Sequence, residues 1–290
     1  MDYTLREWVG LARVNGSIAE AAVQVQARES GVTPETVRAT MRHHLKCMQE
    51  AVQNGVDERL RSVTGLTGGQ AARLLERLRS GQSLCGTLLG KAETYALATA
   101  ECNACMGKIV AAPTAGACGI LPGAILAMME EKGVTEEAAV EALFVAAAVG
   151  QSIATQASIS GAEGGCQAEC GAAAAMAAAA RVYLEGGTAQ QSADAAAFAL
   201  MNLLGLVCDP VGGLVEVPCV YRNVGSSGVA FTAADMALSG ICCPIEPDEV
   251  ILAMKEVGDA MPSSLRETGE GGCAACESIR ARLKMIQDRR

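Results

Sequence analysis

The sequence has few aromatic residues and almost no histidine. Only 3% of its 290 residues are Phe, Trp or Tyr, and its two histidines, His43 and His44, are adjacent. With only two histidines, a mixed His/Cys zinc site is nearly excluded, and so is Ser-His-Asp or Cys-His catalysis confined to this chain. Because His43 and His44 lie in a charged segment, we expect both to face solvent.

Basic clusters and export signals are also absent. The net charge is −9, and Lys and Arg are scattered rather than gathered in a stripe. This argues against nucleic acid or an anionic membrane as the main partner. The opening residues, MDYTLREWVG, contain no basic segment leading into an apolar run, so we expect no signal peptide and a cytoplasmic location.

Two uncharged stretches, 109–129 and 142–162, are long enough to cross a bilayer. The first is broken by two prolines and three glycines, and the second contains Gln, Ser and Thr throughout. Both stretches are too broken or too polar to span a membrane comfortably. We therefore expect them to be buried elements of the fold, with no membrane partner.

Half of the residues are hydrophobic, and Ala, Leu, Val, Ile and Met supply most of them. Ala, Leu and Met are strong helix formers, and no alternating pattern persists long enough to indicate a sheet. The sequence predicts an all-α fold. It would be a single large helical domain spanning residues 1–290, with residues 1–64 as a helical N-terminal segment. Buried Ala-rich helices would carry Gly/Pro loops that converge on one site.

Helix start and stop signals give approximate boundaries. Thr33 followed by Pro34 is typical of a helix start, and Thr135 is a capping signal before a buried apolar helix. The expected helices are 5–56 with a break near Gly31, 70–79, 91–106, one ending at Gly133, one from Thr135, an Ala-rich helix ending at Gly186, one after Thr188, 232–238, 247–258 and 277–290.

Thirteen cysteines without an export signal should remain reduced. Cysteines in helical surroundings are interpreted as small buried hydrophobes; they are Cys47, Cys102, Cys105 and Cys170. The CxxC pairs at 102–105 and 273–276 lack the βαβ context of a redox pair, and their flanks do not suit zinc.

Four other cysteines lie in Gly/Pro turns, within TAGACGILPG, EGGCQAE, LVCDPVGG and EVPC; they are Cys118, Cys166, Cys208 and Cys219. Thiolates on loops at helix ends are well placed to hold a metal centre, because loops can converge while helices supply rigidity. With almost no histidine, the composition favours an iron–sulfur cluster, although the compact ferredoxin spacing is absent.

Four segments resemble a known family: NACMGKIVAAPTAGACGILPGA, GAEGGCQAECGAAAAMAAAA, GLVCDPVGGLVEVPC and LRETGEGGCA. Together they are similar to the α subunit of bacterial iron–sulfur-dependent L-serine dehydratase (L-serine ammonia-lyase), from about Gly65 to Ala274. The resemblance implies a lyase of amino-acid degradation and gluconeogenesis that converts L-serine into pyruvate and ammonia. It also implies a 4Fe-4S cluster held by three cysteines, here Cys166, Cys208 and Cys219.

Three ligands for four irons would leave one iron open to bind the serine hydroxyl and carboxylate as a Lewis acid. Because PTAGACG precedes a helix, its backbone N–H groups suit the substrate carboxylate; the candidates are Thr114, Ala115, Gly116 and Gly119. A tight turn between helices explains that stretch equally well. Capping or core hydrogen bonding explains the polar residues beside the motifs, which are Asn103, Glu163, Glu169, Arg222 and Asn223.

No general base is evident in this chain. In the family a β region carries a Ser/His/Thr-rich motif near the active site, so we expect a hetero-oligomer in which a beta subunit completes the pocket. In some relatives a C-terminal cysteine caps the open iron. Cys273 or Cys276 can take that role, or can be fillers at the base of the last helix.

Other functions remain open from the sequence alone. The chain could be a related cluster-dependent lyase, such as a cysteine desulfidase or a hydroxy-acid dehydratase. It could also be an inactive cluster-bearing sensor or scaffold, or a cysteine-rich helical protein without a cofactor. No residue in the motifs separates serine from cysteine or threonine as the substrate.

Overall fold

The computed structural model describes residues 3–287, and side chains as far as residue 284. Within those residues it contains no β-strand, and the single isolated bridge joins Cys208 and Arg266. The α-helices are α1 (Leu5–Asn15), α2 (Ile18–Ser30), α3 (Pro34–Gly55), α4 (Gln70–Arg79), α5 (Gly86–Ala104), α6 (Ile120–Lys132), α7 (Glu136–Gln156), α8 (Gly161–Gly164), α9 (Ala172–Leu184), α10 (Ala189–Leu203), α11 (Cys219–Leu238), α12 (Pro247–Ala260) and α13 (Glu277–Gln287). The predicted all-α class is confirmed.

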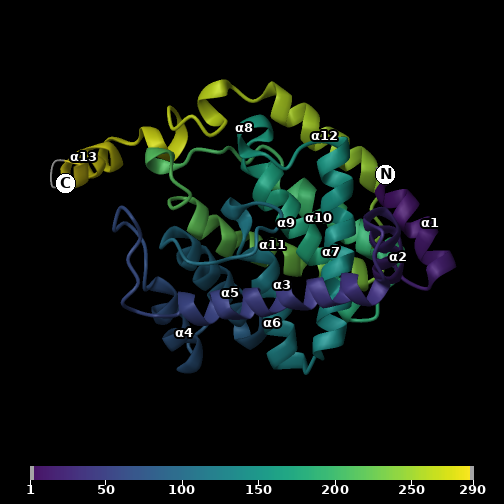
Figure 1. The fold of residues 1–290 in the computed structure, drawn as a ribbon. Helices are drawn as coiled ribbons and strands as arrows, with labels where there is room; N and C mark the ends of the chain where they lie inside the picture. Colours follow the sequence, from purple (N-terminus) through teal and green to yellow (C-terminus); the bar gives the residue numbers. More distant parts are fainter. Residues whose placement is uncertain (1–2, 288–290) are drawn as a thin grey trace.

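The Ala-rich helix α9 lies at the centre of the fold (Figure 1). Helices α6, α7, α10 and α11 pack around it, and every residue from Ala172 to Val182 is buried. Alanine favours the helix and also lets neighbouring backbones approach closely, because its side chain occupies little space. The alanine run therefore forms the axis that fixes the loops at both ends of the surrounding helices.

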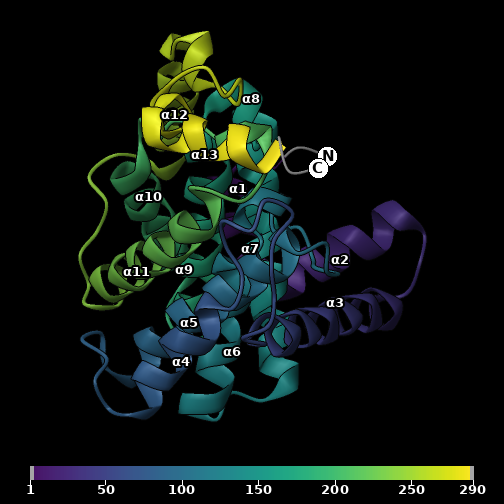
Figure 2. The same ribbon diagram turned by 90° about the vertical axis from the view of Figure 1, so that its left-hand side faces the viewer.

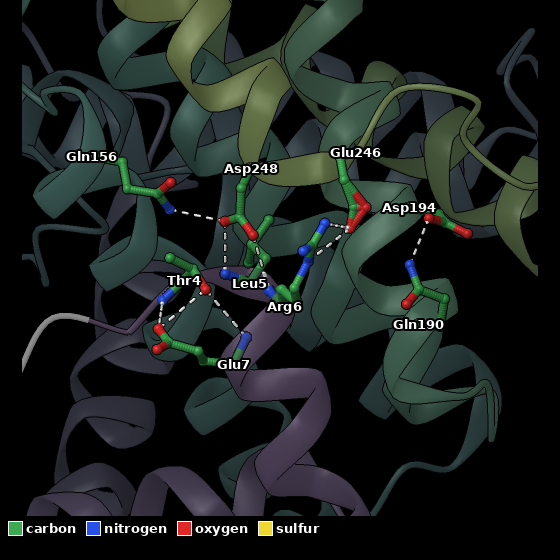
Figure 3. A network of polar contacts seen from close by, with 9 residues as sticks. All are labelled: Thr4, Leu5, Arg6, Glu7, Gln156, Gln190, Asp194, Glu246 and Asp248. Atoms are coloured by element: carbon green, nitrogen blue, oxygen red, sulfur yellow. Dashed lines mark hydrogen bonds and ion pairs between the residues drawn. The ribbon is translucent and has the colours of Figure 1, made fainter.

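The N-terminal helix is fixed to the C-terminal part of the chain (Figure 3). The Asp248 carboxylate on α12 accepts hydrogen bonds from the backbone N–H groups of Leu5 (2.7 Å) and Arg6 (3.0 Å). Gln156 also donates to Asp248 at 2.8 Å, and Arg6 lies 3.1 Å from Glu246. Asp248 thus satisfies two N–H groups that the helix itself leaves without partners, and α1 packs on the same core as α7 and α12.

Most predicted helices are present, with two differences. The 5–56 stretch breaks at Gly16 as well as at Gly31, because both glycines adopt the left-handed conformation that ends a helix. Helix α11 begins at Cys219, not near Thr232 as predicted. The segment NVGSSG reads as a turn, yet Gly225 is accommodated inside a continuous helix whose other face is packed.

Among the described residues, α7 is the one helix long and apolar enough to cross a membrane by length and composition. Within its apolar window 67% of the residues are buried in the fold, where α7 packs against α2 and α9. We interpret α7 as a core helix, and the second uncharged stretch of the sequence falls largely within it.

The chain after α12 returns to the middle of the fold before it reaches α13. Short 3₁₀ turns at Ser263–Leu265 and Gly272–Ala275 lie along this return, and the second of them contacts the 3₁₀ turn Val211–Gly213. Figures 1 and 2 place α13 at the periphery of the molecule. This return path brings the LRETG motif against the loop that carries Cys208.

Candidate metal centre

The three predicted cluster cysteines are all buried, and their thiols lie near one another. Cys166 follows α8, Cys208 lies in the extended segment after α10, and Cys219 is the first residue of α11. Their exposed fractions are 2%, 4% and 7%. Negative charge on Cys166 raises the pKa of both Cys208 and Cys219, so the three sulfur atoms lie within electrostatic reach of one another.

A five-residue π-helix, Gln167–Gly171, holds Cys166 in place. Single π-helical turns inside α-helices are frequently found at functional sites. The Gln167 side chain donates to Met254 O (2.8 Å) and accepts from the Gly205 N–H (2.9 Å). The sulfur atoms of Cys166 and Cys170 lie 3.4 Å apart, within hydrogen-bond distance. The π-helix is thereby joined to α12 and to the segment that leads to Cys208.

Backbone bonds fix Cys208. Its N–H donates to Leu265 O at 2.8 Å, and its carbonyl accepts from the Glu267 N–H at 2.7 Å. Glu267 has a φ of 64°, which is unusual for a residue other than glycine. The LRETG motif therefore supports the loop from outside.

Asp209 and Arg222 form a buried ion pair next to the thiols, with 2.8 Å between Asp209 Oδ1 and Arg222 Nη2. Arg222 also donates to Val207 O at 2.7 Å, and the Cys273 N–H donates to the other Asp209 oxygen at 2.6 Å. The positive charge of Arg222 lowers the pKa of the Cys166 thiol. A positive group beside buried thiolates stabilises their charge.

Glu169 on the π-helix is the acidic group of the site. Thr114 Oγ1 donates to it at 2.7 Å, and the Cys208 thiol lies 3.7 Å from its other oxygen. Burial raises the pKa of Glu169. A Cβ at Gly161 would lie 2.7 Å from Glu169 Oε2 and 2.9 Å from Cys208 Sγ, and one at Gly116 would lie 2.9 Å from Glu169 Oε1. Glycine at both positions keeps the space around Glu169 and Cys208 open.

The pKa values of the three thiols indicate how readily each would bind a cationic metal group. Burial raises the pKa of Cys208 above its ordinary value, and raises that of Cys219 to about 12. The pKa of Cys166 is lowered, first by the hydrogen bond from Cys170 and then by Arg222. Buried thiols of this kind ionise readily only beside added positive charge, which a metal supplies.

The donors suit a cluster better than a single ion. Among the described residues no three His, Cys, Asp or Glu side chains converge closely enough to hold one metal ion. In an iron–sulfur cluster each thiolate binds its own iron, so the sulfurs need not meet at one point. Three buried thiols, a neighbouring guanidinium and glycines that leave the space open fit such a group.

The predicted carboxylate cradle lies beside this site. Ala115 and Gly116 begin the 3₁₀ turn Ala115–Ala117, so their N–H groups have no partner within the turn. The Gly119 N–H already donates to Asn223 Oδ1 at 2.8 Å, and the Thr114 hydroxyl is bonded to Glu169. The role of these four residues stays a prediction, and Ala115 and Gly116 are the pair with backbone donors to offer.

Asn223 joins the cradle to α11, because its side-chain amide donates to Gly116 O (2.7 Å) and to Cys219 O (2.9 Å). Asn103 donates to Ala115 O at 3.3 Å. Glu163, in contrast, is exposed and bonds to Ser158 away from the thiols. Of the polar residues singled out beside the motifs, four surround the site and Glu163 does not.

The other cysteines separate as follows. Cys47, Cys102 and Cys170 are buried as predicted, whereas Cys105 is only half-buried. Cys118 is fully buried, and its thiol lies 3.9 Å from Thr99 O. The two C-terminal cysteines are exposed; Cys273 lies beside Asp209 through its N–H, and Cys276 lies 3.9 Å from Gly272 O. His43 and His44 are exposed, as expected.

Comparison with known proteins gives the family. The family model for the serine dehydratase alpha chain matches residues 13–274. The chain belongs to this family. The resemblance drawn from the four motifs is therefore confirmed, and the matched region contains all three predicted cluster cysteines.

Several curated relatives cover nearly the whole chain. The probable L-serine dehydratase alpha chain of Bacillus subtilis is 50% identical over 269 residues, which is 93% of this chain and 89% of the relative. The L-serine dehydratase alpha chain of Peptoniphilus asaccharolyticus is 40% identical over 276 residues, or 95% and 94%. The L-serine dehydratase of Streptomyces coelicolor is 36% identical over 271 residues, which is 92% of this chain but only 59% of that protein.

The sequence did not indicate four residues that organise the site: Cys170, Asp209, Glu216 and Glu267. The sequence does contain a clue to Asp209 and Glu216, because they are the two acidic residues of an otherwise apolar, Pro/Gly-rich loop. Both are buried in the structure. Cys170 reads as a small helical hydrophobe. Glu267 approaches the thiols only because the chain returns after α12, and no local pattern reveals that return.

Proposed function

We propose that this chain is the α subunit of an L-serine ammonia-lyase that converts L-serine into pyruvate and ammonia. We further propose that Cys166, Cys208 and Cys219 hold a 4Fe-4S cluster. The observation that carries the proposal is that these three thiols are buried near one another, beside Glu169 and Arg222. The names of the relatives that align over most of this chain support the substrate.

When bound, the cluster would supply a Lewis acid that makes the serine hydroxyl a better leaving group. The residues of the chain then do the rest. The N–H groups of Ala115 and Gly116 are placed to hold the substrate carboxylate at the start of the 3₁₀ turn. Glu169, whose pKa is raised by burial, keeps a proton to a higher pH than an exposed carboxyl does, next to the Cys208 sulfur.

The overall elimination balances without an oxidant. The Cα proton and the hydroxyl leave L-serine as water, and the resulting enamine tautomerises and hydrolyses to pyruvate and ammonia. Neither histidine lies at the site, because both are exposed on α3. We therefore assign the base that takes the Cα proton to a beta subunit. The alpha-chain names of the relatives support such a partner, and so does the unaligned remainder of the Streptomyces protein.

We place that partner on the face around Glu216. This buried carboxylate accepts hydrogen bonds from Ser62, Thr64 and Thr67, so the 56–69 loop lies against the cluster loop. Four large apolar side chains are exposed on the segments that meet there, namely Val63, Met106, Leu214 and Tyr221. A second chain covering them would also close the site beside Cys219.

The remaining expectations follow from the same proposal. Thirteen cysteines of which none forms a disulfide in the described residues suit a reducing cytoplasm. Release of pyruvate suits amino-acid degradation and supply to gluconeogenesis. We take the whole chain, residues 1–290, as one domain, because α2 and α3 pack on α7 and α5.

Anaerobic purification followed by absorbance spectroscopy and iron and sulfide counts tests the cofactor. The wild type should be brown, with about four irons and four sulfides per chain, and Cys208→Ala should lose both the colour and the iron. Cys47→Ala, which removes a buried cysteine on α3, should keep them. An iron-free wild type after reconstitution, or equal iron in Cys208→Ala, would contradict the proposal.

A second measurement tests the activity and the partner. L-Serine added to the reconstituted chain together with a beta subunit should give pyruvate and ammonia in equal amounts. The chain alone should be far less active. Full turnover without a partner would overturn the assignment of the base, and release of sulfide from L-cysteine in place of turnover of L-serine would overturn the substrate.

A further inference from the structure

A cleft of about 460 Å³ lies beside α8. Its walls are the turn after α7, α8 itself, the start of the π-helix at Gln167 and Ala168, α12 and the return segment 263–268. None of the three cluster cysteines and none of residues 114–119 lines it. Its volume falls in the range of about 300–1,000 Å³ that is usual for small-molecule sites.

The cleft presents one cation and one carboxylate that have no charged partner. The Arg266 guanidinium donates to Glu163 O at 3.4 Å, and within the described side chains no carboxylate forms an ion pair with it. The Glu163 carboxylate accepts from Ser158 Oγ at 2.5 Å and likewise has no ion-pair partner there. The other two charges of the lining, Lys255 and Asp259, neutralise each other at 2.6 Å.

We propose that this cleft binds a small α-amino acid in its zwitterionic form. The carboxylate would pair with Arg266, whose planar guanidinium suits bidentate recognition, and the ammonium would pair with Glu163. Ser158, Ser263 and Thr268 supply hydroxyl groups in the same lining. A ligand with a single charge would satisfy one wall of the cleft and leave the other unpaired.

The cleft is connected to the cluster loop through the return segment. Leu265 O and the Glu267 N–H are the two backbone groups that bond to Cys208, and Arg266 lies between them. A ligand that holds Arg266 therefore restrains the backbone that supports Cys208, and the coupling is reciprocal because binding free energies are linked. Ligand binding in the cleft would therefore be coupled to the segment that carries Cys208.

Calorimetric titration of the cluster-free, full-length protein tests the ligand chemistry. The probe is L-alanine, which has both charges but no hydroxyl and cannot be dehydrated. It should bind, whereas propionate, which lacks the ammonium, and ethylamine, which lacks the carboxylate, should each bind at least about tenfold more weakly. Equal binding of propionate would contradict a zwitterion site.

Variants locate the binding. Arg266→Gln and Glu163→Gln should each weaken L-alanine binding at least about tenfold, whereas Arg77→Gln, at an exposed position on α4, should leave it unchanged. Circular dichroism checks that each variant keeps its helices. Binding that survives both Arg266→Gln and Glu163→Gln, or no binding of L-alanine to the wild type, would overturn the proposal.

Hydrogen exchange separates this cleft from the substrate site. L-Alanine should slow exchange in residues 158–164 and 263–268, and at the Cys208 amide that bonds to Leu265 O. Protection confined to residues 114–119 would instead assign the binding to the carboxylate cradle and refute the cleft. Because the protein is cluster-free in these experiments, their outcome is independent of the iron count and of serine turnover that test the proposed function.

Discussion

The sulfur atoms of Cys166 and Cys170 lie 3.4 Å apart and share a hydrogen bond, in which Cys170 is the donor when Cys166 is ionised. This contact is the largest cause of the lowered pKa of Cys166, and burial and Glu169 act against it. The two cysteines therefore have different roles, although Cys166 directly precedes the short π-helix on which Cys170 lies. Cys166 is the metal ligand in our proposal, and Cys170 is the buried donor that favours its ionised form.

Cys170→Ala should raise the pKa of Cys166, because the thiolate loses its donor. Metal ligands must be deprotonated before they bind, so iron uptake by Cys170→Ala should begin at a higher pH than in the wild type. The measurement is iron content after anaerobic reconstitution at a series of pH values. Cys170→Ser, which keeps a donor, should resemble the wild type.

A buried cysteine elsewhere provides the control for this experiment. Cys102 on α5 is buried and lies 3.8 Å from Lys108 O, so Cys102→Ala removes a similar volume without touching Cys166. Its pH profile of iron uptake should match the wild type. If Cys170→Ala and Cys102→Ala give the same profile, the contact with Cys166 has no role in iron binding.

Gly161→Ala should prevent iron binding and leave the fold intact. The added Cβ would lie 2.7 Å from Glu169 Oε2 and 2.9 Å from Cys208 Sγ, so both side chains must move out of the site. Gly225→Ala is the matched control, because nothing lies within 4 Å of a Cβ at that position on α11. It should stabilise the protein by about 0.5–1 kcal/mol, the usual gain when alanine replaces glycine in a helix. Iron counts and thermal unfolding check both variants, and full iron in Gly161→Ala would refute the crowding argument.

The sequence predicted the parts of this protein that have local causes. Thr33 with Pro34 starts α3, and Thr135 caps α7 through a bond from the Ala138 N–H, because both signals act within one turn of the helix. The alanine run predicted a buried helix since few other residues allow such close packing. The role of Cys166, Cys208 and Cys219 as cluster ligands was inferred from resemblance to the family and stays a prediction; the structure shows that all three are buried.

Other features could not be predicted, because they depend on contacts between distant segments. The bonds from Cys208 to the LRETG motif join residues that α11 and α12 separate in the chain. The early start of α11 was hidden by the glycines and serines of NVGSSG, which are tolerated in the helix because α9 and α10 pack against it. The π-helix at GGCQAECG has no sequence period of its own.

Glu216→Ala should destabilise the protein by about 2–4 kcal/mol, because it leaves buried hydrogen-bond donors without an acceptor. The carboxylate is 3% exposed and accepts from Ser62 Oγ, from Thr64 Oγ1 at 2.7 Å and from the Thr67 N–H at 3.2 Å. Glu216→Gln retains an acceptor and should lose less. Urea unfolding measures both variants, with Glu256→Ala on the exposed face of α12 as the control.

The same variants test whether Glu216 organises the partner face. If it does, Glu216→Gln should keep its iron but bind a beta subunit more weakly than the wild type does, since the 56–69 loop is no longer held as firmly. Unchanged stability of Glu216→Ala would show that these hydrogen bonds have no net effect. Unchanged binding of the beta subunit would place the interface elsewhere.

The cluster-free protein should lose stability as the pH rises, partly because of Glu169. Burial raises the folded-state pKa of this carboxyl above 4.5, so the folded chain binds the proton more tightly than the unfolded chain. The contribution is fully present below about pH 4.5 and is lost as the pH rises through the folded-state pKa. Glu169→Gln removes the titration, so its free energy of unfolding should vary less with pH over this range.

Thr114→Val should raise the folded-state pKa of Glu169. The Thr114 hydroxyl donates to Glu169 at 2.7 Å and lowers its pKa against the effect of burial. Without that donor the pKa of Glu169 should rise further, so the loss of stability should extend to a higher pH than in the wild type. Urea unfolding at a series of pH values measures this, with the exposed Glu256→Gln as the control. Parallel curves for Thr114→Val, Glu169→Gln and the wild type would show that Glu169 has the same proton affinity in the folded and unfolded chains.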